Sequence, residues 1–95
     1  MFIGKKMVSP RVADAIPQWL QNMLWYLIET MEVDVKKRVQ LFELSTVLQD
    51  GIIRQRIIHL QQPNYHREYV VSAVVMVEAL IVAIDTGKYC VLIMV

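Results

Sequence analysis

Apolar and polar positions repeat with two different periods along the chain, and the change of period separates a helical part from several strands. From Ile16 to Met31, apolar residues recur at intervals of three and four, as expected of one buried helical face. Pro17 suits a first helical position, because its missing N–H would have no partner there. The spacing predicts one long helix from Pro17 to about Glu32.

The rest of the chain favours extended structure. Ahead of the helix, residues 2–8 predict a short strand and residues 11–15 a turn of helix. After it, segments rich in β-branched and aromatic residues predict strands over 39–47, 52–61, 65–71, 77–85 and 89–95. Asp50-Gly51 accepts the positive φ angles of a tight hairpin, and Pro63 marks the next turn.

Strands that follow one another across short turns predict an antiparallel sheet. We therefore expect an α+β fold in a single domain, residues 1–95, with an antiparallel sheet of five to six strands and one long helix packed on one face.

The apolar content suggests that part of the surface is covered by another subunit. Apolar residues make up 56% of the 95 residues, above the usual value of about 45–50% for soluble domains. The predicted strand from Tyr89 to Val95 carries no charge and would promote aggregation at an exposed sheet edge. It is therefore either a central strand or covered by a partner, and we expect a homodimer or higher oligomer.

Charge and cysteine content favour a cytoplasmic protein. The net charge of +1 gives no overall field for nucleic acid or a membrane surface, so neither is an expected partner. Cys90 is the only cysteine, which excludes an internal disulfide and fits a reducing compartment. Lys5 and Lys6 interrupt what would be the apolar part of a signal peptide, and the run from Val70 to Ile84 is too short to span a bilayer.

The candidate binding residues gather in one stretch, residues 54–69. They are Arg54, Arg56, His59, Tyr65, His66, Arg67 and Tyr69. Arg54 and Arg56 are two residues apart and should share a face of a strand, to which a short turn could add Arg67. Arginines with tyrosines form hot spots for protein partners, and they also hold phosphates and stack on bases. A solvated strand face with Glu43 and Glu68 in ion pairs is the third interpretation.

Trp25 joins this set because the aromatic residues of the helix point in different directions. Trp19 and Tyr26 are seven residues apart and share a face, whereas Trp25 lies about 100° round the helix from Tyr26. The three rings cannot all pack on one sheet, so one of them should be exposed or lie in an interface.

Patterns of catalysis and metal binding are missing from the sequence. The three glycines are isolated and form no phosphate or dinucleotide loop. His59 and His66 are seven residues apart across a proline turn, which is not the spacing of a zinc site. No serine or cysteine stands in a nucleophile motif. We expect a protein without enzymatic activity, metal or cofactor.

The block from Gln55 to Gln61, with Pro63 and Tyr65 behind it and residues 39–45 ahead, resembles a family of small proteins from Gram-positive bacteria, their phages and mobile elements. The family is known as the 960th domain of unknown function. The resemblance covers nearly the whole chain, although the hydrophobic residues 70–77 replace an expected polar loop. It implies an accessory factor that inhibits a host defence protein, with sequestration of a nucleotide-type signal as the alternative.

Overall fold

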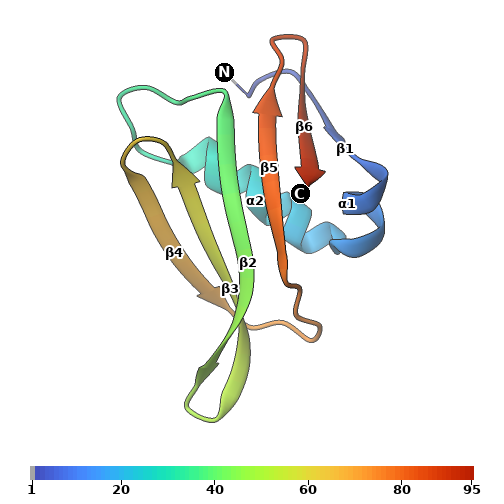
Figure 1. The fold of residues 1–95 in the computed structure, drawn as a ribbon, viewed down its shortest axis with the longest axis vertical. Coiled ribbons are helices and arrows are strands. Elements are labelled where there is room, and N and C mark those ends of the chain that lie inside the picture. Colours follow the sequence, from blue (N-terminus) through green and yellow to red (C-terminus); the bar gives the residue numbers. More distant parts are fainter. Residues whose placement is uncertain (1) are drawn as a thin grey trace.

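The structure, a computed structural model, describes residues 2–95 and contains one six-stranded sheet and two helices (Figure 1). Met1, which belongs to the predicted domain 1–95, lies outside the described residues. The elements follow in the order β1 (Lys5–Val8), α1 (Pro10–Ala15), α2 (Gln18–Thr30), β2 (Val39–Gln49), β3 (Ile52–Gln61), β4 (Tyr65–Val71), β5 (Ala79–Asp85) and β6 (Tyr89–Met94). The α+β class predicted from the sequence is confirmed.

The sheet is mixed, and the prediction of a purely antiparallel sheet is wrong. Its strand order is β1-β6-β5-β2-β3-β4, and β1 pairs in parallel with β6, with Lys5 opposite Tyr89. The other four pairs of neighbours are antiparallel. Two helices follow β1 in the chain, so no hairpin turn fixes its direction.

The structure has two helices and no single long helix: α1 lies where a turn of helix was predicted over residues 11–15, and α2 lies within the predicted helix from Pro17 to Glu32. Ser9 caps α1 through its side-chain oxygen, which accepts a hydrogen bond from the Val12 N–H. Ile16 is extended because it precedes Pro17, and this break separates α1 from α2. The helix α2 spans 13 residues and ends at Thr30, before the predicted end at Glu32.

The hairpins match the turn chemistry of the sequence. Asp50 and Gly51 have φ angles of 52° and 78°, as expected of a tight turn between β2 and β3. The predicted bounds of β3 and β4 agree with the structure, whereas β2 continues two residues further, to Gln49. The β2–β3 hairpin extends beyond the rest of the sheet in Figure 1.

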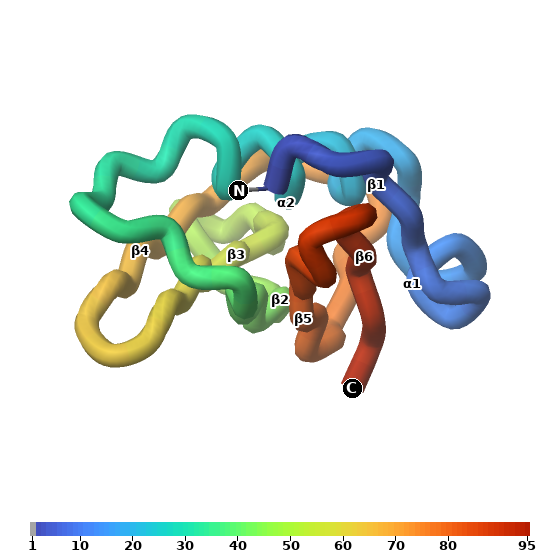
Figure 2. Tube along the Cα trace, turned by 90° about the horizontal axis from the view of Figure 1, so that it is seen from above, coloured from blue at the N-terminus to red at the C-terminus, as the bar shows by residue number. Residues whose placement is uncertain are grey.

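The helices pack on one side of the sheet. Apolar side chains of α2, among them Leu20, Leu24 and Ile28, belong to the same buried cluster as Phe42 of β2 and Ile81 of β5. In Figure 1, α2 crosses behind β2 and β5, and Figure 2 shows both helices on the same side of a curled sheet. Within residues 2–95, no helix lies over the other side, which is called the open face below.

Candidate functional site

The sheet divides the predicted binding residues between its two faces. Along β3, the side chains at 55, 57, 59 and 61 are buried against the helices, so Arg54 and Arg56 lie on the open face. In β4, His66 pairs with Leu60 and shares that face. Arg67 pairs with His59 and lies on the helix side, together with Tyr65 and Tyr69. The three arginines therefore do not converge.

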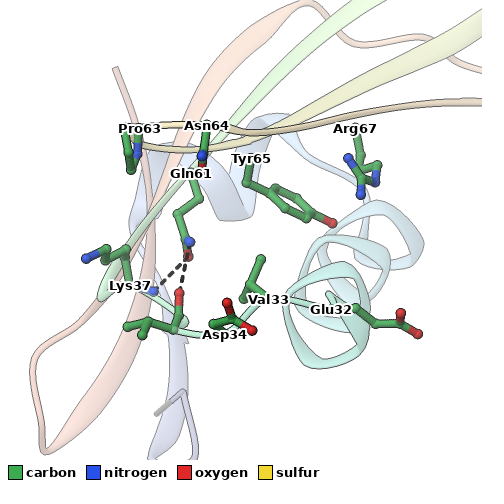
Figure 3. A pocket seen from close by; sticks show the side chains of 10 residues that line it. Glu32, Val33, Asp34, Lys37, Gln61, Pro63, Asn64, Tyr65 and Arg67 are labelled. Carbon is green, nitrogen blue, oxygen red and sulfur yellow. Dashed lines mark hydrogen bonds between the residues drawn. The ribbon is translucent and has the colours of Figure 1, made fainter.

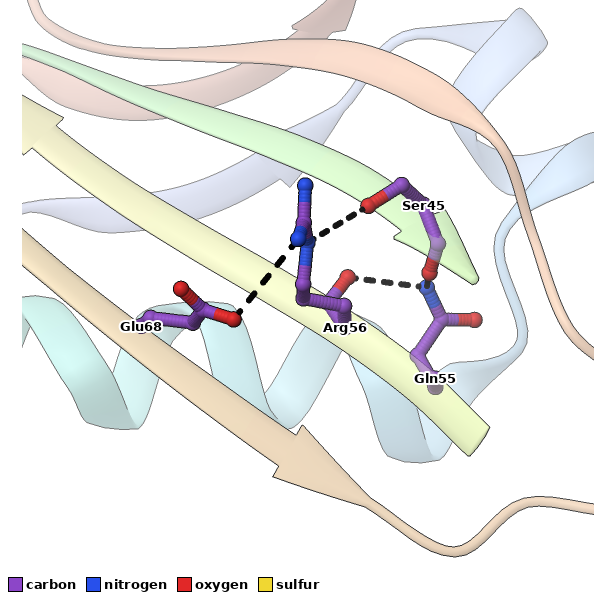
Figure 4. A network of polar contacts seen from close by, with 4 residues as sticks. All are labelled: Ser45, Gln55, Arg56 and Glu68. Atoms are coloured by element: carbon purple, nitrogen blue, oxygen red, sulfur yellow. Dashed lines mark hydrogen bonds and ion pairs between the residues drawn. The ribbon is translucent and has the colours of Figure 1, made fainter. Parts of the chain in front are cut away.

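The open-face arginines already have partners within the protein. Arg54 Nη1 donates to Ser72 Oγ at 2.6 Å, and Arg56 Nε donates to Ser45 Oγ at 3.1 Å. Arg56 Nη1 also lies 3.8 Å from a carboxylate oxygen of Glu68, in the arrangement shown in Figure 4. Both side chains are half-buried; the contacts of Arg56 reach β2 and β4, and that of Arg54 reaches the residue after β4.

His59 is a core residue. Its ring is fully buried, stacks on Phe42 with ring centroids 4.4 Å apart, and meets the edge of Tyr65 at 5.1 Å. Its Nε2 lies 2.8 Å from Gln40 Oε1, whereas its buried Nδ1 has no hydrogen-bond partner within residues 2–95. Burial, and secondarily the charge of Lys36, lowers the pKa of His59 from 6.5 to about 4. The imidazole is therefore neutral near pH 7.

Buried glutamines connect His59 to the segment between α2 and β2. Gln40 Nε2 donates to the Lys37 carbonyl at 3.0 Å and to Gln61 Oε1 at 2.6 Å. Gln61 in turn accepts from the Lys37 N–H and donates to the Val35 carbonyl. Because the amide nitrogen of Gln40 is the donor, its oxygen accepts from His59, whose proton then sits on Nε2. The sequence carries no spacing signal for this network.

Tyr65 and Arg67 border a hollow of about 450 Å³ between β4 and the α2–β2 segment (Figure 3). The Arg67 guanidinium lies 4.9 Å from the centre of the Tyr65 ring. Burial raises the pKa of Tyr65, and a hydrogen bond with Tyr69 adds to the shift. Glu32 and Asp34 line the opposite wall, so the hollow carries both signs of charge and has no predominantly positive lining for a phosphate.

Trp25 contributes to the core instead of to an exposed surface. Its side chain is buried, its ring lies 6.4 Å from that of Phe2, and Lys6 Nζ lies 5.8 Å from the ring centre. The exposed aromatic residues of α2 are Trp19 and Tyr26. The three rings therefore do not all pack on the sheet, as expected, and the two that are exposed are those of Trp19 and Tyr26.

The open face carries rows of apolar side chains that the sequence analysis did not single out. The pairing places Leu60, Leu41, Val82 and Ile93 side by side across β3, β2, β5 and β6. The neighbouring rows continue the same surface, and one of them also carries Glu43, between Ile58 and Leu80. We call this surface the apolar patch; its residues are Met7, Val39, Leu41, Ile58, Leu60, Leu80, Val82, Ile84, Val91, Ile93 and Val95.

A signal for the apolar patch was present in the sequence. The strands β5 and β6 are apolar at nearly every position, and this pattern is typical of strands that are covered on both faces. Here α2 covers one face, and within residues 2–95 the other face remains open. Beside Val39 and Leu41, a hollow of about 360 Å³ reaches Lys37, Arg38 and Gln62.

The remaining features concern metal ligands, the single thiol and membrane-spanning helices. No three His, Cys, Asp or Glu side chains gather within residues 2–95 in a way that could hold a metal ion. Cys90 is a buried free thiol, and β1 and β5 flank its strand, so β6 is internal to the sheet. No helix in the described residues is both long and apolar enough to cross a membrane.

No family model and no curated protein matches this chain. Among solved structures, the chain is similar to one described as the crystal structure of the protein of unknown function from Enterococcus faecalis. The two share 15% sequence identity and superpose with a TM-score of 0.68, over 95% of this chain and 86% of that chain. At this identity the likeness shows a shared fold alone, and the family resemblance stays a prediction.

Proposed function

We propose that this protein is a non-catalytic binding protein whose open face docks against another protein. The observation that carries the proposal is the apolar patch, which spans several neighbouring strands and includes clearly exposed side chains such as Val39 and Leu80. Large contiguous apolar surfaces on soluble domains mark interaction sites, because leaving them in water is unfavourable.

The border of the patch suits a protein interface. Arg54, Arg56, Ser45 and Glu68 lie on the open face beside the apolar rows and are aligned by their own contacts. A polar rim around an apolar centre is the usual organisation of an interface, and arginine is enriched among the residues that contribute most to binding. The non-catalytic part of the proposal is supported by His59, whose ring is fully buried.

The family resemblance supplies the partner class of this proposal, which is a host protein that an accessory factor of a phage or mobile element would inhibit. The alternative of a sequestered nucleotide has less support. It required Arg54, Arg56 and Arg67 to clamp a phosphate together, and the register of β3 and β4 puts Arg67 on the other face.

Photo-crosslinking in cells that produce the protein tests the proposal. A benzophenone amino acid replaces Leu80 on the open face, and a matched variant carries it at Tyr26 on the outer side of α2. These side chains are 38% and 61% exposed. We expect discrete crosslinked products from position 80 and none from position 26. Products that are missing at position 80, or that are the same for both positions, would refute the proposed function.

A further inference from the structure

We infer that the occupant of the open face is a second copy of this chain, packed sheet against sheet about a two-fold axis. The inference rests on the proposed function only in taking the open face as a surface that docks against a protein; it names a second copy, in place of a host protein, as the occupant of that face. The resulting dimer would have four layers, with the two sheets inside and the helices of each subunit outside. Stacked sheets pack about 10 Å apart, and twisted sheets of like geometry align at about 30°.

The strand composition gives the first argument. A continuous apolar strand is stable when both of its faces are covered, and α2 covers one face of β5 and β6. On the open face these strands contribute Val82, Ile84, Val91 and Ile93, which are each partly exposed in the single chain. A second sheet with the same apolar rows would remove these side chains from water on both subunits at once.

Charge on the open face gives the second argument. A two-fold interface brings a surface against itself, so a face with one sign of charge would repel its own copy. This face carries both signs, with Arg54, Arg56 and Glu68 at its border and Glu43 within the apolar rows, between Ile58 and Leu80. The chain as a whole has a net charge of only +1. The open face is therefore compatible with its own copy.

The available area is the third argument. Each outward-facing position in a sheet takes about 33 Å², from a strand spacing of about 4.8 Å and a two-residue repeat of about 6.8 Å. The apolar patch and its polar border therefore cover on the order of 500 Å² per subunit. A symmetric pair would bury on the order of 1,000 Å², which reaches the lower limit for a specific interface. A reversible dimer is expected at this size.

Light scattering coupled to size-exclusion chromatography tests the inference with a matched pair of variants. The wild-type protein at high micromolar concentration should have twice the chain mass of 11.1 kDa, about 22 kDa. Leu80→Lys places a charge in the apolar patch and should return the mass to that of one chain. Leu48→Lys is the control, because Leu48 is 68% exposed at the β2–β3 hairpin and lies outside the patch.

Circular dichroism first establishes that each variant is folded, and Val39→Lys, at another exposed position of the patch, replaces Leu80→Lys if that variant unfolds. A monomeric wild-type protein, or a patch variant that stays dimeric, overturns the inference. Dissociation by Leu48→Lys alone would move the contact to the hairpin and also overturn it. If the wild type is monomeric while position 80 crosslinks to a different protein, the proposed function stands without self-association.

Discussion

Acidification should destabilise this protein between pH 6.5 and pH 4 through a single buried side chain, His59. The ring is fully buried between Phe42 and Tyr65, and its Nδ1 has no hydrogen-bond partner within residues 2–95. A proton on Nδ1 would place an unpaired charge in the core. The pKa of His59 is therefore lowered to about 4 in the folded protein, from 6.5 in the absence of burial.

The sign of the effect follows from which state binds the proton first. Below pH 6.5 the unfolded chain protonates His59, whereas the folded chain resists protonation until about pH 4. The contribution of the neutral ring is therefore complete above pH 6.5 and is lost as the pH falls toward 4. One pKa unit corresponds to about 1.4 kcal/mol, so the loss is about 2 kcal/mol at pH 5 and about 3 kcal/mol in full.

Urea unfolding at fixed protein concentration, followed by tryptophan fluorescence, measures this loss between pH 8 and pH 4. His59→Gln keeps a neutral donor for Gln40 and should flatten the profile, whereas His66→Gln, at an exposed position, should leave it unchanged. Asp85 also makes the stability depend on pH, but at lower pH than His59 does. The N–H groups of Phe2 and then Gly87 lower the pKa of Asp85 below 3.8, so its stabilisation is lost only as the pH falls through that range. A wild-type profile that is flat from pH 7 to pH 5 would refute the argument for His59.

Three substitutions test the packing and the polar contacts by urea unfolding. Gln40→Leu leaves the buried Nε2 of His59 without its acceptor and should cost about 2–3 kcal/mol, and a loss below about 0.5 kcal/mol would contradict the network. Gly4→Ala brings a Cβ to 2.8 Å from the Lys88 carbonyl oxygen and should cost about 1–3 kcal/mol. An unchanged urea midpoint would show that the backbone around Gly4 moves to make room for the Cβ, and would contradict this prediction. Arg56→Ala should cost less than about 1 kcal/mol, because the two side chains of its ion pair with Glu68 are 36% and 46% exposed and water screens the attraction, and a loss above about 1 kcal/mol would contradict this.

The local structure of the sheet was predictable because turn chemistry and alternation agree. The bounds of β3 and β4 follow from Asp50-Gly51 and Pro63, which fix the turns on either side of β3. The parallel pairing of β1 with β6 could not be predicted in this way. It joins Lys5 to Tyr89 at opposite ends of the chain, and no short turn between β1 and β6 fixes the relative direction of the two strands.

The distribution of the candidate residues over two faces could not be read from their nearness in sequence, because neighbouring residues of a strand point to opposite faces. Gln61 pairs with Tyr65, so even-numbered residues of β3 and β4 share one face and odd-numbered residues share the other. This register separates Arg56 from Arg67 and places His59 in the core. The division between the faces was predictable within each strand, because residues with odd and even numbers point to opposite faces. The partner of His59, Gln40, lies on a different strand and had no such signal.

The most direct test of a covered open face is the relaxation that a dissolved paramagnetic agent causes in methyl NMR signals at high protein concentration. In the single chain, Val39 and Leu80 are 49% and 38% exposed, Leu48 and Val74 are more exposed, and Leu44 is buried. A protein docked on the open face predicts that the Val39 and Leu80 methyls are shielded like those of Leu44, while Leu48 and Val74 relax strongly. Relaxation of Val39 and Leu80 in proportion to their single-chain exposure would contradict a covered open face.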